Sequence, residues 1–299
     1  MPYVHKVCNA LRFPIFVSRF GPTLRVQLKR TFIAQSLTNR PRNILPSSWS
    51  LFIHAIEMAD SNQWYFAYGS NMLSDVFIKR RKVNPIQQQV AYIKTHTLCF
   101  NVMGMPYRDP AMGGIREAME NDLPVYGVAY WLTPEDMRQV IVSEGGGIAY
   151  RTKKFMAILE NESTSISVTT LVARHDISLA YERLPSERYM GLLIRGAREQ
   201  SLPKFYQDRL LSQPIFTCPE SHRFQIGTWL FSSFWQRVAV GIEMGVHRFK
   251  DDEGNVPGWF LVIFDILLWT MWLYHDYAHS IIWGRGDGLG FKPFSRSFM

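Results

Sequence analysis

The sequence predicts an α+β domain, in which strands and helices are segregated along the chain. Aromatic and β-branched runs come first, a helix start signal interrupts them, two more β-rich runs follow, and helical patterns come last. This order lacks the regular strand–helix alternation of a parallel α/β sheet. With 299 residues, of which 47% are hydrophobic, the chain is also long enough to bury a sizeable core.

The individual elements are predicted from residue preferences and from turn signals. The clearest helix start is at Thr133, which can cap the helix, with Pro134 at the first helical position and two acids in the first turn; the glycines from Gly145 end this helix. Strands are expected at Gln63–Tyr68, within Val90–Val102, and at Leu123–Leu132, Arg151–Leu159 and Ser165–Ala173, and further helices at Met72–Lys82, Ser186–Ala197 and Lys204–Leu211.

The first segment, residues 1–57, differs from the rest of the chain in charge. It carries eight basic residues and no acid before Glu57, so the formal net charge of +8 is largely a property of this segment. Such a composition is typical of a mitochondrial presequence, although Pro22 and Pro41 interrupt any helix there. The alternative is a stretch upstream of a natural start at Met58. Because these basic residues precede the folded domain, we expect no nucleic-acid partner.

A domain over residues 58–215 and a C-terminal extension over 216–299 complete the predicted organisation. Cys8, Cys99 and Cys218 are far apart and odd in number, which fits neither a disulfide framework nor a metal site. We therefore expect no metal and a reducing compartment, the cytoplasm, with mitochondrial targeting or membrane association as lower-ranked alternatives.

The C-terminal extension contains an almost continuous apolar stretch near 259–283, where we expect a helix. Its length approaches the ~20 residues that cross a bilayer. Asp265, His275 and Asp276 interrupt it, and a charge in the middle of a span costs about 2.5–3.5 kcal/mol. We therefore favour a buried helix or hairpin over a membrane span, and membrane contact is the less favoured alternative.

Three segments carry residue types that suit chemistry. The first is a strand followed by a sharp turn, whose successive backbone N–H groups can bind a carboxylate or an oxyanion. Taken alone, such a segment is more often an ordinary turn. Its residues are Tyr65, Phe66, Ala67, Tyr68, Gly69, Ser70 and Asn71.

The second segment places Glu144 at the C-terminal end of the predicted helix, before Gly145-Gly146-Gly147. The helix dipole is negative there, and with burial it would raise the pKa of the carboxylate. A glutamate tuned in this way is a competent proton shuttle near neutral pH. On spacing alone, a solvated glutamate before a helix end is the simpler interpretation.

The third segment is a capped helix, from Pro185-Ser186 through Tyr189 to Gly196-Ala197, followed by Leu202-Pro203 and Tyr206. Tyr189 would lie in its first turn. A half-buried packing tyrosine is the alternative to a role in binding.

In this order and spacing, the three segments resemble the γ-glutamylcyclotransferase family. The family's opening strand Tyr-Phe-Ala-Tyr-Gly-Ser-Asn is matched at 65–71, and its Glu-Gly followed by Tyr is matched at Glu144 and Tyr150. Further matches are Gly113-Gly114, the strand Val125–Leu132, and the Pro-Ser-x-x-Tyr helix with Leu-Pro-x-x-Tyr over 185–206. The resemblance covers about half the chain, roughly 62–213.

The resemblance implies a small closed β-barrel of mixed strands with flanking helices. It also implies cleavage of γ-glutamyl amides by intramolecular cyclisation, with release of 5-oxoproline and an amine and without a metal or an organic cofactor. By this resemblance Glu144 is the acid and base, Tyr65 to Ser70 line the pocket, Gly69, Ser70 and Asn71 hold substrate oxygens, and Tyr189 reaches the substrate. Tyr150 is either a pocket wall or a core residue.

Two features depart from the family's pattern. Where its members commonly have Leu-Asp a few residues before Glu-Gly, this chain has Val140-Ile141-Val142-Ser143. This change affects what supports Glu144. The loop from Glu144 to Tyr150 is also rich in glycine, which affects how firmly it closes.

The resemblance leaves the substrate open among glutathione, a glutathione conjugate and a γ-glutamyl amino acid. Some fungal biosynthetic pathways use such enzymes to trim glutathione adducts, and the aromatic extension would then be a lid or a pocket wall. The alternatives are a γ-glutamylamine cyclotransferase and a membrane-tethered, non-catalytic γ-glutamyl-binding protein.

Overall fold

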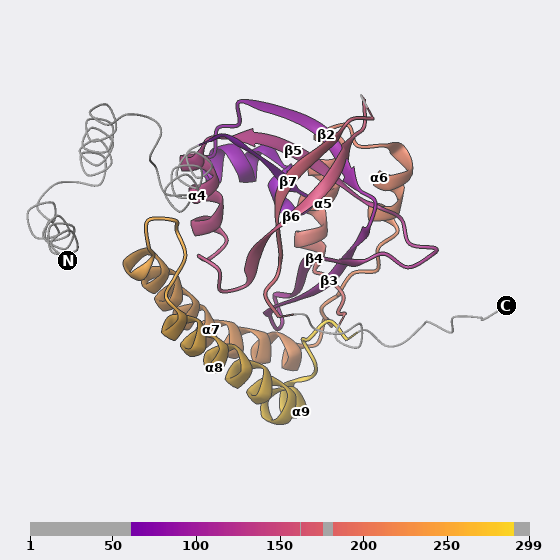
Figure 1. Ribbon diagram of the computed structural model, residues 1–299. Helices are drawn as coiled ribbons and strands as arrows, with labels where there is room; N and C mark the ends of the chain where they lie inside the picture. Colours follow the sequence, from indigo (N-terminus) through magenta and orange to yellow (C-terminus); the bar gives the residue numbers. More distant parts are fainter. Residues whose placement is uncertain (1–60, 162, 176–181, 290–299) are drawn as a thin grey trace, which may run out of the picture. The chain divides into compact units, whose positions relative to one another are not determined.

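The computed structural model describes residues 61–161, 163–175 and 182–289 (Figure 1). The basic segment 1–57, and Glu162 between the predicted strands Arg151–Leu159 and Ser165–Ala173, lie outside the described residues. Within them the predicted α+β class and the closed mixed barrel are confirmed. The barrel strands are β1 (Gln63–Ala67), β2 (Gln87–Ile93), β5 (Val125–Leu132), β6 (Tyr150–Leu159) and β7 (Ser165–Ala173).

The barrel closes in the order β1-β5-β2-β6-β7. Strand β1 pairs antiparallel with β5, where Tyr65 lies opposite Tyr130, and parallel with β7, where Tyr65 lies opposite Thr169. The other pairs are antiparallel. The short strand β1 closes the barrel by pairing in parallel with β7. Its end, and the turn that follows it, therefore lie between β5 and β7.

Both faces of β1 are buried, which explains its almost uninterrupted apolar sequence. Phe66 belongs to a core made of strand residues and of Tyr68, which directly follows β1. Tyr65 and Ala67 point the other way, into a second core that helices complete. Alternate residues of one strand thus stabilise the inside of the barrel and its helical cover.

Three helices supply that cover and confirm the predicted capping signals. Helix α4 (Pro134–Ser143) is capped by the Thr133 side chain, and α5 (Glu187–Glu199) by that of Ser186. Helix α6 (Lys204–Leu211) follows. The predicted helix over 72–82 is instead two short turns, η2 (Ser70–Met72) and η3 (Asp75–Arg80).

A separate two-stranded sheet joins β3 (His96–Met105) to β4 (Asp109–Glu117). The sequence did not predict β4, because its proline and two glycines are poor strand formers. Gly114 is needed there, since a Cβ atom would lie 2.1 Å from the Asn101 side-chain oxygen. The close approach of the Asn101 side chain therefore requires a glycine in β4, although glycine is a poor strand former.

The C-terminal extension is a helical hairpin that lies alongside the barrel (Figure 1). Its first arm is α7 (His222–Phe249), and its second arm runs through α8 (Gly258–Tyr274), η5 (His275–His279) and α9 (Ser280–Trp283). A Cβ atom on Gly227 would lie 2.3 Å from Trp283, and one on Gly245 would lie 2.5 Å from the Phe260 ring. These two glycines allow the arms to pack closely.

The apolar helix expected near 259–283 is present, but only one of its sides is covered. Gly258–Trp283 is long and apolar enough to cross a membrane by length and composition, and 22% of its most apolar window is buried. Its interrupting charges face the folded domain. Asp265 accepts hydrogen bonds from Arg174 and from His175.

Candidate active site

A small pocket lies where the turn after β1 meets the end of α4. Its volume is about 90 Å³. It is lined by Tyr65, Tyr68, Gly69, Ser70, Asn71, Arg81, Met112, Gly113, Glu144, Tyr150, Leu171 and Tyr189.

Asn71 joins two of the segments that the sequence predicted to act together. Its side-chain nitrogen donates hydrogen bonds to the Glu144 carboxylate oxygen Oε1, at 2.9 Å, and to the Tyr65 hydroxyl, also at 2.9 Å. Its side-chain oxygen is buried and has no hydrogen-bond partner among the described residues. The turn after β1 and the helix-end carboxylate therefore share one cavity, with an acceptor available to a ligand.

Arg81 is the charged residue of the pocket that sequence reasoning missed; the apolar lining residues Met112 and Leu171 were not predicted either. Its guanidinium lies 2.9 Å from Glu144 Oε1 and donates to the Ser143 hydroxyl at 2.8 Å. Ser143 stands in the stretch that departs from the family's pattern, so Arg81 and Ser143 supply support for Glu144 there. Within the four consecutive cations Lys79–Lys82, nothing in the sequence distinguishes Arg81.

The backbone of Gly113 holds two tyrosines at the pocket. Its N–H donates to the Tyr189 hydroxyl at 3.0 Å, and its carbonyl accepts from the Tyr150 hydroxyl at 2.9 Å. A Cβ atom at Gly113 would lie 3.0 Å from the Tyr189 hydroxyl. Because Tyr189 accepts from Gly113, its own hydroxyl hydrogen remains available to a ligand.

Burial keeps the phenols of this pocket protonated. It is the main cause that raises the pKa of Tyr189 to about 12, against the opposing hydrogen bond from Gly113. Burial also raises the pKa values of Tyr65, Tyr68 and Tyr150 above the usual range, and the Glu144 charge adds to each. The tyrosines are thus neutral hydrogen-bonding groups near neutral pH.

Most of the predicted site residues meet in this pocket, but two do not line it. The side chain of Phe66 packs in the strand core, and Ala67 packs in the core beneath the helices. Their alternation with Tyr65 and Tyr68 holds β1 in register and sets where the turn begins. Tyr150, for which a wall and a core position were both open, lines the pocket and is half-buried.

The loop after Glu144 is fixed by glycine conformations and by the hairpin. Gly145, Gly146 and Gly147 have φ angles of +90°, +61° and +94°, a region that other residues rarely adopt. The Gly146 carbonyl accepts the Val256 backbone N–H at 2.9 Å. Further along the loop, the Ile148 carbonyl accepts from Arg174 Nε at 2.8 Å. The turn of the C-terminal hairpin therefore supports the loop that carries Glu144.

A larger, apolar cavity of about 360 Å³ lies beside the pocket, between the hairpin and the barrel. Met112 lines both cavities, and the residues on either side of Glu144, Ser143 and Gly145, line the larger one. The hairpin contributes Trp235, Val238, Ala239, Ile242, Glu243, Val246, His247, Phe264, Leu267, Leu268 and Met271.

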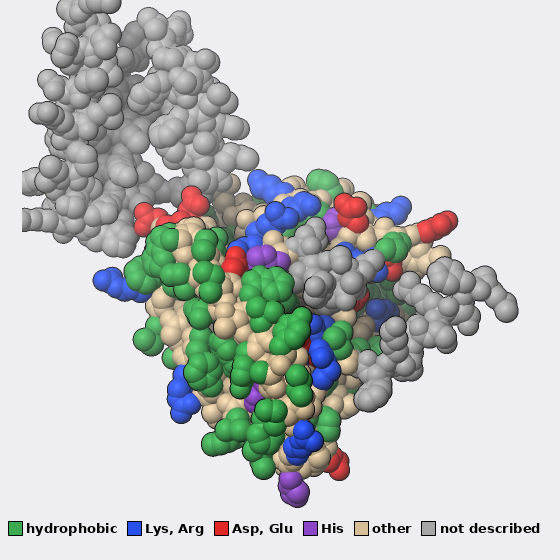
Figure 2. All heavy atoms as spheres, turned by 90° about the horizontal axis from the view of Figure 1, so that it is seen from below, with side chains coloured by type: hydrophobic (Ala, Val, Ile, Leu, Met, Phe, Trp, Pro, Cys, Tyr) green, Lys and Arg blue, Asp and Glu red, His purple; other side chains and the backbone are tan. Residues whose placement is uncertain are grey.

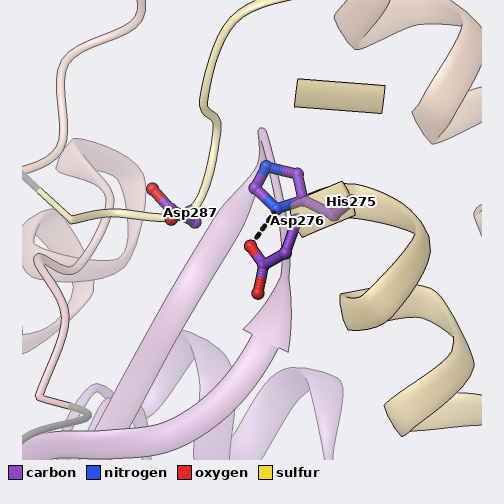
Figure 3. Close-up of side chains that lie close together, drawn as sticks. All are labelled: His275, Asp276 and Asp287. Carbon is purple, nitrogen blue, oxygen red and sulfur yellow. Dashed lines mark hydrogen bonds and ion pairs between the residues drawn. The ribbon is translucent and has the colours of Figure 1, made fainter. Parts of the chain in front are cut away.

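His275, Asp276 and Asp287 lie close enough together to suggest a metal site (Figure 3). Their donor atoms, however, are already engaged. Asp287 is paired with Arg183 and Arg285, and His275 Nδ1 lies 2.9 Å from Asp276 while its Nε2 accepts a backbone N–H from Gly286. Burial lowers the pKa of His275, consistent with a neutral ring. Two arginines therefore fill the place of a cation.

Comparisons with known proteins match both halves of the described chain. A family model described as the AclK C-terminal domain matches residues 221–282, which are the helical hairpin. The chain is 49% identical over 221 residues to gamma-glutamyl cyclotransferase gliK of Claviceps purpurea, covering 73% of this chain and 100% of that relative. It is 34% identical over 245 residues to gamma-glutamyl cyclotransferase gliK of Aspergillus fumigatus, covering 75% of this chain and 89% of that relative.

Solved structures are more distant. One described as a gamma-glutamyl cyclotransferase is 20% identical, with a TM-score of 0.46, and the match covers 56% of this chain and 98% of that chain.

Proposed function

Because the chain belongs to the γ-glutamyl cyclotransferase family, a family of enzymes, we propose that the pocket around Glu144 cyclises a γ-glutamyl amide to 5-oxoproline and releases the amine. The observation that carries this proposal is the hydrogen bond between Asn71 and Glu144, at 2.9 Å in a pocket that Tyr189 also lines. It brings a proton acceptor, a polar turn and a neutral phenol within reach of one small ligand.

In the proposed reaction the α-amine of the γ-glutamyl group attacks its own side-chain carbonyl. The α-ammonium first gives a proton to the Glu144 carboxylate. The new C–N bond closes the ring as the carbonyl becomes an oxyanion. Glu144 gives its proton to the departing nitrogen and then accepts the second proton from the ring nitrogen. The oxyanion reforms the carbonyl as the original C–N bond breaks, and Glu144 returns the remaining proton to the released amine. Since the attack is intramolecular, much of the entropic cost is met by the substrate itself.

The other groups of the pocket would hold the substrate in its folded-back form. The unpartnered oxygen of Asn71 is suited to accept from the α-ammonium. Gly69 and Ser70 lead into the helical turn η2, where the first backbone N–H groups lack a partner within the turn and can bind an oxygen. The Tyr189 hydroxyl is free to donate to the substrate.

We further propose that the substrate carries a large apolar group, as an S-conjugate of glutathione does. The larger cavity beside Glu144 lies within the size range of small-molecule sites, and most of its lining is apolar. Free glutathione has no apolar group to fill it. Trimming of glutathione adducts in secondary metabolism, which the resemblance led us to expect, agrees with such a cavity.

The first experiment measures 5-oxoproline released from glutathione and from S-benzylglutathione by the full chain. The wild type is expected to act on both and to prefer the conjugate. Glu144→Gln should keep the fold and reduce 5-oxoproline release about 10³-fold, because the proton shuttle is lost. Glu135→Gln, an exposed glutamate on the same helix, is the matched control and should stay active.

The two proposals fail separately in this experiment. A fully active Glu144→Gln variant would remove the assignment of the base. If the wild type prefers free glutathione, the proposal that the substrate is a glutathione conjugate is wrong, while the proposed cyclisation still holds. A wild type that binds γ-glutamyl compounds but releases no 5-oxoproline would favour the non-catalytic alternative, and a preference for γ-glutamyl-lysine would favour the γ-glutamylamine one.

A further inference from the structure

The outer side of the helical hairpin is unusually apolar for a surface. Among the described residues, 25 large hydrophobic side chains are exposed, and 17 of them lie between His222 and Trp283. Figure 2 shows hydrophobic side chains gathered over one face of the molecule. An exposed concentration of this kind indicates an interaction surface, because isolated exposed apolar residues are normally scattered.

On the second arm the exposed residues recur at helical spacing and form a stripe without charge. It includes Val262, Ile266, Leu273, Tyr277 and Ile281, which are between 53% and 75% exposed. From Trp259 to Ile281 the stripe is about 33 Å long at 1.5 Å per residue. The two acids of this arm are paired with arginines, Asp265 with Arg174 and Asp276 with Arg285.

On the first arm the exposed apolar residues alternate with arginines. Phe234 and Met244 are 59% and 65% exposed, and Arg237 and Arg248 follow them by three and four residues, on the same side of the helix. The acid of this arm, Glu243, lines the inner cavity and is also exposed. The remaining acids of the hairpin, Asp251–Glu253, lie in its turn, beyond the end of both stripes.

We propose that this face docks on the surface of an anionic membrane and lies in the plane of its headgroups. The face combines an apolar stripe, the exposed aromatics Trp229, Trp259 and Trp269, and the exposed arginines Arg237 and Arg248, which suits insertion beside anionic lipid headgroups. The inference is independent of the reaction proposed for Glu144.

Two other occupants fit the observations less well. A membrane span would surround α8 with lipid and separate Asp265 from Arg174. A second copy of the chain that packs its apolar stripe against this face would bring Arg237 and Arg248 to exposed residues that carry no charge, Val262, Ile266, Leu273, Tyr277 and Ile281. The charge pattern of the face therefore favours a lipid surface.

The test is sedimentation of the full chain with vesicles of phosphatidylcholine and phosphatidylserine in equal amounts. The wild type should bind these vesicles more tightly than vesicles of phosphatidylcholine alone. Ile266→Glu should lower vesicle binding about tenfold or more, because it removes an inserted side chain and adds a charge. Met156→Glu, which changes an equally exposed residue of the barrel, should bind like the wild type.

Release of 5-oxoproline from a soluble γ-glutamyl substrate should be the same for wild type and Ile266→Glu, which shows that the fold is intact. Failure of the wild type to bind either vesicle would overturn the proposal. Resistance of the vesicle-bound chain to alkaline extraction would identify a span instead. A dimer in lipid-free sedimentation velocity that Ile266→Glu dissociates would identify a second copy as the occupant.

Discussion

The pocket and the contact between α8 and the barrel each hold a carboxylate beside an arginine, and the difference lies in what remains unused. At Asp265 both oxygens are engaged, Oδ2 by Arg174 and Oδ1 by Arg174 and His175. At Glu144 both Asn71 and Arg81 reach Oε1, so that among the described residues Oε2 has no such contact and is left to a ligand in the cavity. A carboxylate whose two oxygens both accept hydrogen bonds from the protein holds two structural elements together. A carboxylate with one free oxygen beside a cavity can exchange protons with a ligand.

After the loss of Glu144 itself, the largest effect is expected from removing Arg81, the arginine on the pocket side of this comparison. Arg81→Met should lower kcat about 100-fold, because Glu144 loses one of its two positioning contacts and Ser143 loses its partner. Arg81→Lys keeps the charge without the two-pronged contact and should recover part of that loss. Steady-state release of 5-oxoproline measures both variants. A Met variant with wild-type kcat would show that Asn71 alone positions Glu144.

A second effect tests whether the hairpin takes part in substrate choice. Ile242 lines the apolar cavity, and Ile242→Trp should fill part of it. We expect kcat/KM for S-benzylglutathione to fall about 30-fold, while that for free glutathione changes less than about twofold. Val240→Trp, on the exposed side of the same helix, is the control. Equal losses for both substrates would mean that the cavity does not bind the S-substituent.

The sequence predicted the elements around the pocket better than it predicted the C-terminal hairpin. Local signals predicted β1, α4 and the turn after β1, because capping and turn preferences act over a few residues. The combination of segments that resembles the γ-glutamylcyclotransferase family, rather than any local signal, identified Asn71 and Glu144, whose hydrogen bond joins positions 73 residues apart. Arg81 was not predicted, because its role depends on its long-range contact with Glu144 and because its neighbours in sequence are also cations.

Helix α7 was not predicted from the sequence, for a different reason. Gly227 and Gly245 lower helix preference, yet they are the places where Trp283 and the Phe260 ring approach. Close packing against the second arm compensates for the unfavourable residues, and such packing is not visible in a local window. The exposure of one side of the apolar helix was likewise not predictable, because it depends on which side the barrel covers.

A smaller effect is expected at Tyr189, which touches the pocket but transfers no proton. Tyr189→Phe should raise KM about tenfold and change kcat less than about threefold, because one hydrogen bond to the substrate is lost in ground and transition states alike. Tyr206→Phe removes another buried hydroxyl, which does not line the pocket, and should leave both constants unchanged. A Tyr189→Phe variant with unchanged KM would return Tyr189 to a packing role.

The smallest effect on activity is expected at the carboxylate of the hairpin. Partial burial opposes ionisation of Asp265, but hydrogen bonds from Arg174 and His175 hold its pKa below the usual 3.8. Its ionised form therefore stabilises the fold above about pH 4, and this contribution disappears as the pH falls through the lower, folded-state pKa. Asp265→Asn should accordingly destabilise the fold by about 1–3 kcal/mol at neutral pH.

Denaturant titration at several pH values checks this expectation. The difference in stability between wild type and Asp265→Asn should shrink as the solution is acidified below pH 4, while kcat for 5-oxoproline release stays within about twofold of the wild type at neutral pH. A large loss of kcat in Asp265→Asn with unchanged stability would contradict the assignment of Asp265 to a structural role. In that case the contact between α8 and the barrel would act on the loop through Arg174, which also holds the Ile148 carbonyl, and the hairpin would position Glu144.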